Sequence, residues 1–127
     1  AAYEDEPRVN VDVSPRVVHH TQYGKTFLAY HHGHTVRKPE TLLMMCAADW
    51  REDFGNSNSM YAHVGHWHHQ TVTETSLGIV EVHSTMAAKD AYAARGGWRS
   101  RRRAAVIIYD KEYGEIGRFM FYPEMIA

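Results

Sequence analysis

The sequence has a single cysteine and no long apolar run, and each absence excludes a class of protein. With Cys46 alone, the 127-residue chain cannot form an internal disulfide, which fits a reducing compartment. No apolar stretch approaches the ~20 residues that a membrane-spanning helix needs. The first residues, AAYEDEPRVNVDV, are acidic and lack the apolar core of a secretory signal. We therefore expect a cytoplasmic protein without membrane contact.

The chain also lacks an excess of charge of one sign. Its 14 lysines and arginines nearly balance its 15 acidic residues, so the net charge of −1 gives no argument for nucleic acid or an anionic membrane. The proportions of hydrophobic (44%) and charged (23%) residues are typical of a soluble globular domain. The length predicts one domain over residues 1–127, and no repeat or linker divides it.

Short apolar segments that favour strands alternate with two segments that favour helices. Strands are predicted at 17–22, 26–30, 60–64, 71–74, 78–83, 104–109 and 118–122. One helix is predicted from Pro39 to a stop at Gly55, and its apolar run around Cys46 is expected to be core. A second, alanine-rich helix is predicted over 86–94. The fold class is therefore mixed α/β, a mixed sheet with about two helices that cover at least one face.

Histidine is the residue that the sequence has in excess. Seven of the ten histidines fall in two clusters, each at the end of a predicted strand: His31, His32 and His34, then His63, His66, His68 and His69. Strand ends hold loop side chains rigidly, and the adjoining Gly33 and Gly65 permit sharp turns. If the second cluster is extended, His66 and His68 point to the same side. We interpret the clusters as ligands of a transition metal rather than as surface histidines.

Two motifs then resemble a known family. The segment 61–69, YAHVGHWHH, resembles the Gly-His-x-His motif of calcineurin-like metallophosphoesterases, and the segment 26–33, TFLAYHHG, resembles the preceding motif of that family. The whole chain resembles the C-terminal half of phage-type members, including Asp90 and the turn at 111–114. The resemblance implies the C-terminal half of a four-layer α-β-β-α sandwich.

The resemblance also implies a ligand set. His32 and His66 would bind one divalent ion and His68 a second, with Mn, Fe, Zn and Ni not distinguished. In that family the two ions polarise a phosphate ester and generate a metal-bound hydroxide for in-line attack. His31, His34 and His69 match no ligand of the family, so we expect them to be exposed or to orient a ligand.

The earlier motifs of the family, Asp-x-His, Gly-Asp and Gly-Asn-His, do not occur in the sequence. We therefore expect half of a hydrolase for phosphomonoesters or phosphodiesters, with little activity by itself. Such a half leaves a sheet edge and an apolar face uncovered, which predicts a homo-oligomer. The alternative is a non-catalytic, oligomeric module that binds metal or nucleic acid with the same half-fold.

Two further features have competing interpretations. The arginine-rich segment 95–103 can bind phosphates and stack a base, or it can be a solvated loop; its residues are Arg95, Trp98, Arg99, Arg101, Arg102 and Arg103. Glu74 and Glu81 lie on strands after the second histidine cluster. They can assist metal-bound histidines, or they can be exposed strand residues, which is the commoner case; the sequence leaves both interpretations open.

Overall fold

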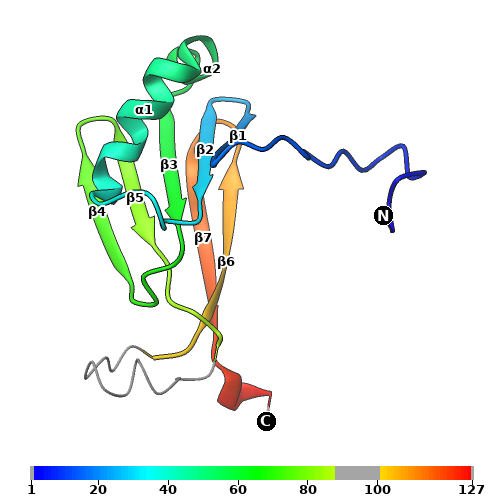
Figure 1. The fold of residues 1–127 in the computed structure, drawn as a ribbon, viewed down its shortest axis with the longest axis vertical. Helices are drawn as coiled ribbons and strands as arrows, with labels where there is room; N and C mark the ends of the chain where they lie inside the picture. The colour runs from blue at the N-terminus through cyan, green and yellow to red at the C-terminus, as the bar shows by residue number, and fades with distance from the viewer. Residues whose placement is uncertain (1, 88–100, 127) are drawn as a thin grey trace.

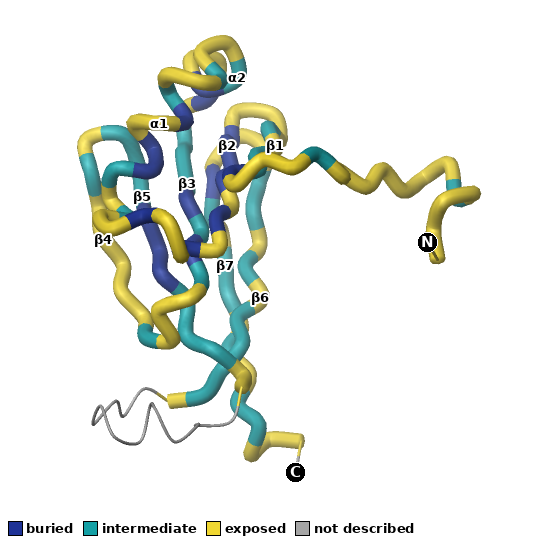
Figure 2. The backbone as a smooth tube through the Cα atoms, in the orientation of Figure 1, coloured by how far each residue is buried: buried dark blue, intermediate teal, exposed yellow. Residues whose placement is uncertain are grey.

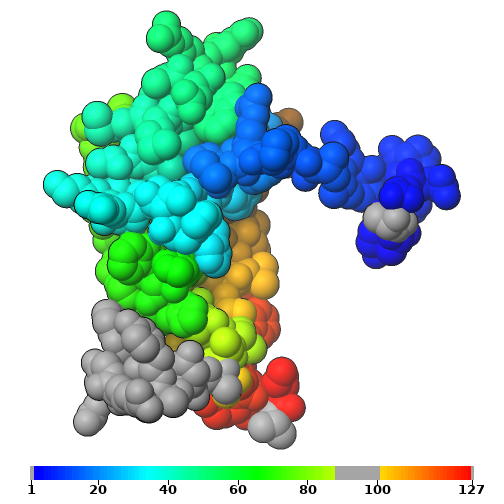
Figure 3. All heavy atoms as spheres, viewed as in Figure 1, coloured from blue at the N-terminus to red at the C-terminus, as the bar shows by residue number. Residues whose placement is uncertain are grey.

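The computed structural model describes residues 2–87 and 101–126 (Figure 1). Its elements follow one another as β1 (Val18–Tyr23), β2 (Thr26–His31), a 3-10 turn (Pro39–Thr41), α1 (Leu42–Asp49), α2 (Arg51–Gly55), β3 (Ser59–Val64), β4 (Thr71–Thr75), β5 (Gly78–Val82), β6 (Ala104–Asp110), β7 (Gly114–Phe121) and a last 3-10 turn (Pro123–Met125). The N-terminal residues before β1 extend away from the rest of the molecule (Figure 3).

The main sheet is mixed, and its central strand is β3. The strand order is β1-β2-β3-β5-β4. β3 runs parallel to both of its neighbours, whereas β1 and β4 are added at the two edges by antiparallel pairing. A parallel pair needs a crossover connection, and α1 and α2 supply it between β2 and β3. The carboxyl ends of β2, β3 and β5 consequently lie at the same edge of the sheet.

The apolar core lies between the helices and one face of this sheet. Side chains alternate between the two faces of a strand, so Ala62 and Val64 of β3 point to the same side as Val80 and Val82 of β5. The helices cover that side with their buried residues, which are Leu42, Leu43, Cys46 and Phe54. Figure 2 shows the buried positions gathered in the central strands and on α1.

The β6–β7 hairpin packs on the opposite face of the sheet. The hydroxyl of Thr26 donates to the carbonyl of Asp110 (2.8 Å), and the backbone N–H of Glu115 donates to the hydroxyl of Tyr61 (2.9 Å). Gly114 sits against Tyr61 and Ser59 with a φ of 76°, and a Cβ atom at this position would collide with both side chains. Glycine is therefore required where the hairpin meets β3.

The mixed α/β class is confirmed, with differences at element boundaries. The predicted helix from Pro39 is divided at Trp50, whose φ and ψ of −124° and 58° are not helical and whose ring packs on His20. β7 begins at Gly114 rather than 118, because Asp110 accepts the N–H groups of Glu112 and Tyr113 and closes a short turn. The helix predicted over 86–94 falls almost entirely outside the described residues.

None of the helices that the structure describes is long and apolar enough to cross a lipid bilayer. This agrees with the absence of a long apolar run in the sequence.

The thiol of Cys46 should be unreactive in the folded protein. The residue lies on the core side of α1 and is fully buried, and burial together with the nearby charge of Asp49 raises its pKa to about 11. We expect alkylation by iodoacetamide at pH 7.5 to be at least about 100-fold slower in the native protein than in denaturant, measured by intact mass. Equal rates in the two conditions would show that this face of α1 is not packed against the sheet.

Candidate functional site

The two histidine loops begin side by side at the carboxyl ends of β2 and β3. His31 is the Cα partner of Val64 in the parallel ladder, and the N–H of Gly65 donates to the carbonyl of His31 (3.2 Å). The ring of His32 then lies edge-on to the ring of His66, with 5.1 Å between their centroids. The pairing of the two strands therefore brings together two of the three predicted ligands.

The second loop is not extended, which corrects one expectation from the sequence. His66 and His68 have φ values of 67° and 57°, so both lie in the left-handed region and do not form a strand with Trp67. Few residues other than glycine adopt this conformation, and each instance costs of order 1–3 kcal/mol. The N–H of Trp67 donates to the carbonyl of Gly65 (2.8 Å) and stabilises the turn. Such local strain is concentrated at functional sites.

Glycine is required where the two loops touch. Gly33 has a φ of 103°, and a Cβ atom there would lie 2.8 Å from the carbonyl oxygen of Gly65 and 3.0 Å from a methyl group of Val64. Any side chain at this position would push the loops apart. The sequence already indicated a sharp turn at Gly33, and the structure shows that the close approach of the second loop is the reason.

His31 shapes the first loop and is buried, as an orienting residue would be. Its Nδ1 accepts the N–H of Gly33 (2.6 Å), and its Nε2 lies 3.2 Å from the hydroxyl of Thr35. Burial lowers the pKa of His31, as do the neighbouring His34 and His32. A neutral imidazole that accepts a backbone N–H fixes the turn that positions His32.

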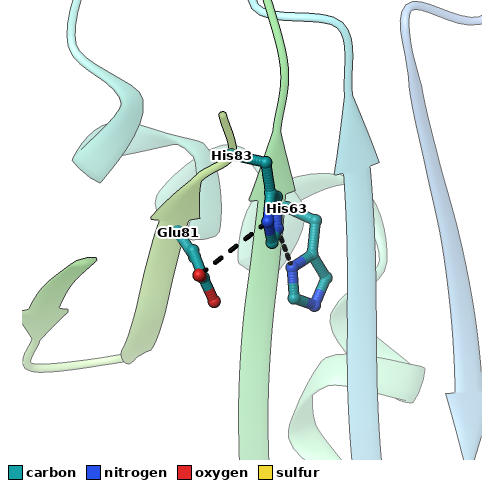
Figure 4. Close-up of side chains that lie close together, drawn as sticks. All are labelled: His63, Glu81 and His83. Atoms are coloured by element: carbon teal, nitrogen blue, oxygen red, sulfur yellow. Dashed lines mark hydrogen bonds and ion pairs between the residues drawn. The ribbon is translucent and has the colours of Figure 1, made fainter. Parts of the chain in front are cut away.

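A second group of side chains lies on the face of the sheet that the hairpin covers. His63 of β3 is the Cα partner of Glu81 of β5, and His83 follows two residues later (Figure 4). Within residues 2–87 and 101–126, these three form the group whose metal-ligating atoms all lie within 4.8 Å of one another. Among the described residues, His32, His66 and His68 do not form a group with ligand atoms this close together. Their role as metal ligands therefore stays a prediction.

Glu81 is buried, so the commoner of its two interpretations from the sequence, an exposed strand residue, does not apply to it. Its exposed fraction is 2%, and the guanidinium of Arg118 on β7 donates to both of its carboxylate oxygens (3.0 and 2.9 Å). Gln70 donates a further hydrogen bond (2.8 Å). Burial alone would raise the pKa of Glu81, but the hydrogen bonds from Arg118 and Gln70 outweigh it and hold the pKa below its usual value. The carboxylate is therefore ionised and fully paired.

The two histidines of this group form a chain of hydrogen bonds with a tyrosine. Nδ1 of His63 lies 2.8 Å from Nε2 of His83, and Nε2 of His63 lies 2.7 Å from the hydroxyl of Tyr109. Burial and the neighbouring His83 lower the pKa of His63 to about 4, and burial also lowers the pKa of His83. Burial raises the pKa of Tyr109. Both imidazoles are therefore neutral at pH 7, which is the form that binds metals.

These groups line a cavity of about 430 Å³ between the sheet and the hairpin. Tyr30, Ser84 and Arg103 contribute to its wall beside the histidines. The cavity gives small polar ligands access to His63 and His83.

Alternation of polar and apolar residues in β3 and β5 is a partial sequence signal for this group. His63 alternates with Ala62 and Val64, and Glu81 and His83 alternate with Val80 and Val82, so each strand has one polar and one apolar face. The polar faces meet only because β5 pairs with β3, a long-range contact that alternation within a strand does not reveal.

The described arginines of the segment 95–103 contact their own chain. Arg101 stacks over the ring of Tyr122 (4.0 Å), Arg102 donates to the carbonyl of Met86 (2.9 and 2.8 Å), and Arg103 donates to the hydroxyl of Ser84 (3.0 Å). Arg95, Trp98 and Arg99 lie outside the described residues. Nucleic-acid binding by this segment remains a prediction.

Comparisons with known proteins add no relative. No family model matches the chain, and neither the curated proteins nor the solved structures contain a significant match.

Removal of Arg118 should destabilise the protein strongly. Arg118→Ala would leave the carboxylate of Glu81 buried without a charged partner, and such a change costs roughly 3–5 kcal/mol. Urea denaturation followed by circular dichroism measures the loss. Arg102→Ala is the control, because this partly exposed arginine donates to a backbone carbonyl among the described residues, and its removal should change stability by less than about 1 kcal/mol.

A double variant separates the cost of the unpaired Glu81 charge from the other causes of instability in Arg118→Ala. Glu81→Gln combined with Arg118→Met removes both charges and should recover a large part of the stability lost in Arg118→Ala. If the double variant is as unstable as the sum of the two single variants, the ion pair is not what holds the hairpin to the sheet.

Proposed function

We propose that this chain supplies the histidine ligands of a metal-dependent phosphoesterase centre, with His32 and His66 on one divalent ion and His68 on a neighbouring ion. The observation that carries the proposal is the meeting of His32 and His66 at the carboxyl ends of adjacent parallel strands. Ligand sites in α/β sheets collect at this edge, where loops are held by the strands that precede them.

The separation of the two rings supports a shared ion. Two imidazoles that bind one tetrahedral ion through bonds of about 2.0–2.1 Å have ring centroids about 5 Å apart. The centroids of His32 and His66 are separated by 5.1 Å. The separation is therefore compatible with a shared ion, and Gly33 keeps the two loops close.

The layers of the fold also support the proposal. Helices cover one face of the mixed sheet and the β6–β7 hairpin covers the other, an α-β-β order that is compatible with half of an α-β-β-α sandwich (Figure 1). The remaining features of the half-fold and the assignment of the metal ligands rest on the family resemblance.

When bound, divalent ions would polarise a phosphate ester and activate water for its hydrolysis. The residues of this chain would hold the ions and fix their position. The sequence contains neither the bridging Gly-Asp nor the Gly-Asn-His of the family. The proposal therefore assigns metal and phosphate-ester binding to this chain, with hydrolysis as the reaction class of the complete centre.

A metal titration tests the proposal. Mn²⁺ or Zn²⁺ binding, measured by calorimetry, should weaken by at least about 10-fold in the double variant His66→Ala with His68→Ala. His19→Ala is the matched control, because His19 lies on β1 and pairs only with Asp12 among the contacts described (2.7 Å). An unchanged number of ions and unchanged affinities in the double variant would remove these two residues from the ligand set.

The alternative function, an oligomeric binding module, is favoured by the outer face of the hairpin. Phe119 and Val106 are direct partners across the two strands, and their exposed fractions are 58% and 51%. Ile108, Ile116 and Phe121 are exposed on the same hairpin. Exposed apolar side chains gathered in this way mark interaction surfaces.

The hairpin should therefore form the contact in a homo-oligomer. We expect light scattering coupled to gel filtration to give a mass above one chain, and Phe119→Glu to reduce it to one chain. Val72→Glu, on the exposed edge strand β4, is the control and should leave the mass unchanged. A single-chain mass for the unaltered protein at high concentration would contradict the oligomer.

A further inference from the structure

We propose that His63 and His83 form a second metal site, separate from the histidine loops, which binds a zinc-type divalent cation with Glu81 and Tyr109 as orienting partners. The inference goes beyond the proposed function and does not depend on it, because it uses different residues, on the face of the sheet that the hairpin covers rather than in the loops at the carboxyl ends of β2 and β3.

The two nitrogens that would bind the ion already face each other. Nδ1 of His63 and Nε2 of His83 are 2.8 Å apart. Two nitrogens on one tetrahedral ion with bonds of about 2.0–2.1 Å lie about 3.3 Å apart. An opening of about 0.5 Å, within the reach of small side-chain rotations, therefore creates the coordination geometry. The ion would take the place of the proton that the two rings share, and that proton would move to the outer nitrogen of the ring that carried it, so that both imidazoles stay neutral.

The outer nitrogen of His63 already has the acceptor that a metal-bound imidazole requires, and the outer nitrogen of His83 lies near one but beyond hydrogen-bond distance. A metal-bound histidine donates its remaining N–H to an oxygen acceptor, which fixes the orientation of the ring. Nε2 of His63 lies 2.7 Å from the hydroxyl of Tyr109, and Nδ1 of His83 lies 3.8 Å from a carboxylate oxygen of Glu81. The close-up in Figure 4 shows Glu81 and His63 on opposite sides of the His83 ring.

Glu81 fits the role of a residue that orients His83 better than the role of a direct metal ligand. Arg118 and Gln70 already donate to its two oxygens at 2.8–3.0 Å, so a direct bond to the ion would have to break a charge-assisted hydrogen bond. Its negative charge still lies next to His83 and favours a cation there. The ion would thus have two protein ligands, and its remaining positions would face the cavity of about 430 Å³.

Imidazole ligands select among cations. Two neutral nitrogens in a half-buried site suit Zn²⁺, Ni²⁺ or Cu²⁺, and they are poor ligands for Mg²⁺ or Ca²⁺, which take oxygen ligands. Arg103 and Ser84 at the cavity wall can contact an anion or a water molecule on the open positions of the ion. The proposed ligand is therefore a zinc-type cation with two exchangeable partners at the positions that the protein does not fill.

Imidazole ¹⁵N resonances of the full chain, recorded during a titration with ZnCl₂, test the site residue by residue. We expect Nδ1 of His63 and Nε2 of His83 to move to metal-bound positions, and the same change to occur in the triple variant His32→Ala, His66→Ala and His68→Ala. In His83→Gln the response of His63 should disappear. His19→Gln, on the edge strand, should leave it intact.

A conservative variant supplies a second readout. Tyr109→Phe keeps the ring between the sheet and the hairpin but removes the acceptor for His63, and it should weaken Zn²⁺ binding at this site by about 10-fold. If Zn²⁺ leaves the His63 and His83 resonances unchanged in the folded protein, the two rings form a hydrogen-bonded pair only and the site is refuted. If Zn²⁺ shifts the resonances of His63 and His83 but not those of His32, His66 and His68, the further site stands and the proposed function fails.

Discussion

The parallel pairing of β3 with both of its neighbours is the constraint on which both histidine sites depend. Its pairing with β2 starts the two histidine loops at the same sheet edge, so that His32 and His66 meet. Its pairing with β5 sets His63 beside Glu81. A central strand has two covered faces, and here the helices cover one and the hairpin the other. One strand of six residues, Ser59–Val64, therefore supports two chemically different groups.

The two faces of β3 are stabilised in different ways. On the helix side the contacts are apolar, and burial of these side chains contributes about 25 cal/mol per Å². On the hairpin side the contacts are polar, with Glu81 paired to Arg118 and His63 bonded to Tyr109. Polar groups removed from water are stabilising only if each has a partner, so the hairpin has little freedom to shift on the sheet. The same network fixes the rings of His63 and His83 where the cavity reaches them.

The sequence predicted the elements well, because they are encoded locally. The ends of β2 and β3 follow from short apolar runs, and the approach of His32 to His66 needed only the further assumption that these strands are neighbours. The group around Glu81 was not predicted, because it depends on partners far away in the chain. Arg118 lies 37 residues beyond Glu81, and Tyr109 lies 46 residues beyond His63. No periodicity within a strand reports such contacts.

The geometry of the second loop was also beyond a sequence argument. Alternation in an extended segment placed His66 and His68 on one side, but both residues have a left-handed backbone. The family resemblance pointed to these two histidines but did not predict their backbone conformation, because a motif specifies residue types and spacing rather than dihedral angles.

The two histidine pairs have nearly the same separation, yet they are held by different means. Ring centroids are 5.1 Å apart for His32 and His66 and 5.0 Å apart for His63 and His83. At the loops, backbone strain and the contact at Gly33 set the geometry, so an ion that binds there can offset strain that the free protein already carries. Under the hairpin, hydrogen bonds to Tyr109 and the nearby charge of Glu81 set it, so an ion must displace a proton from a satisfied network. The geometry of the loop pair is therefore set by the backbone, whereas that of the pair under the hairpin is set by side-chain hydrogen bonds.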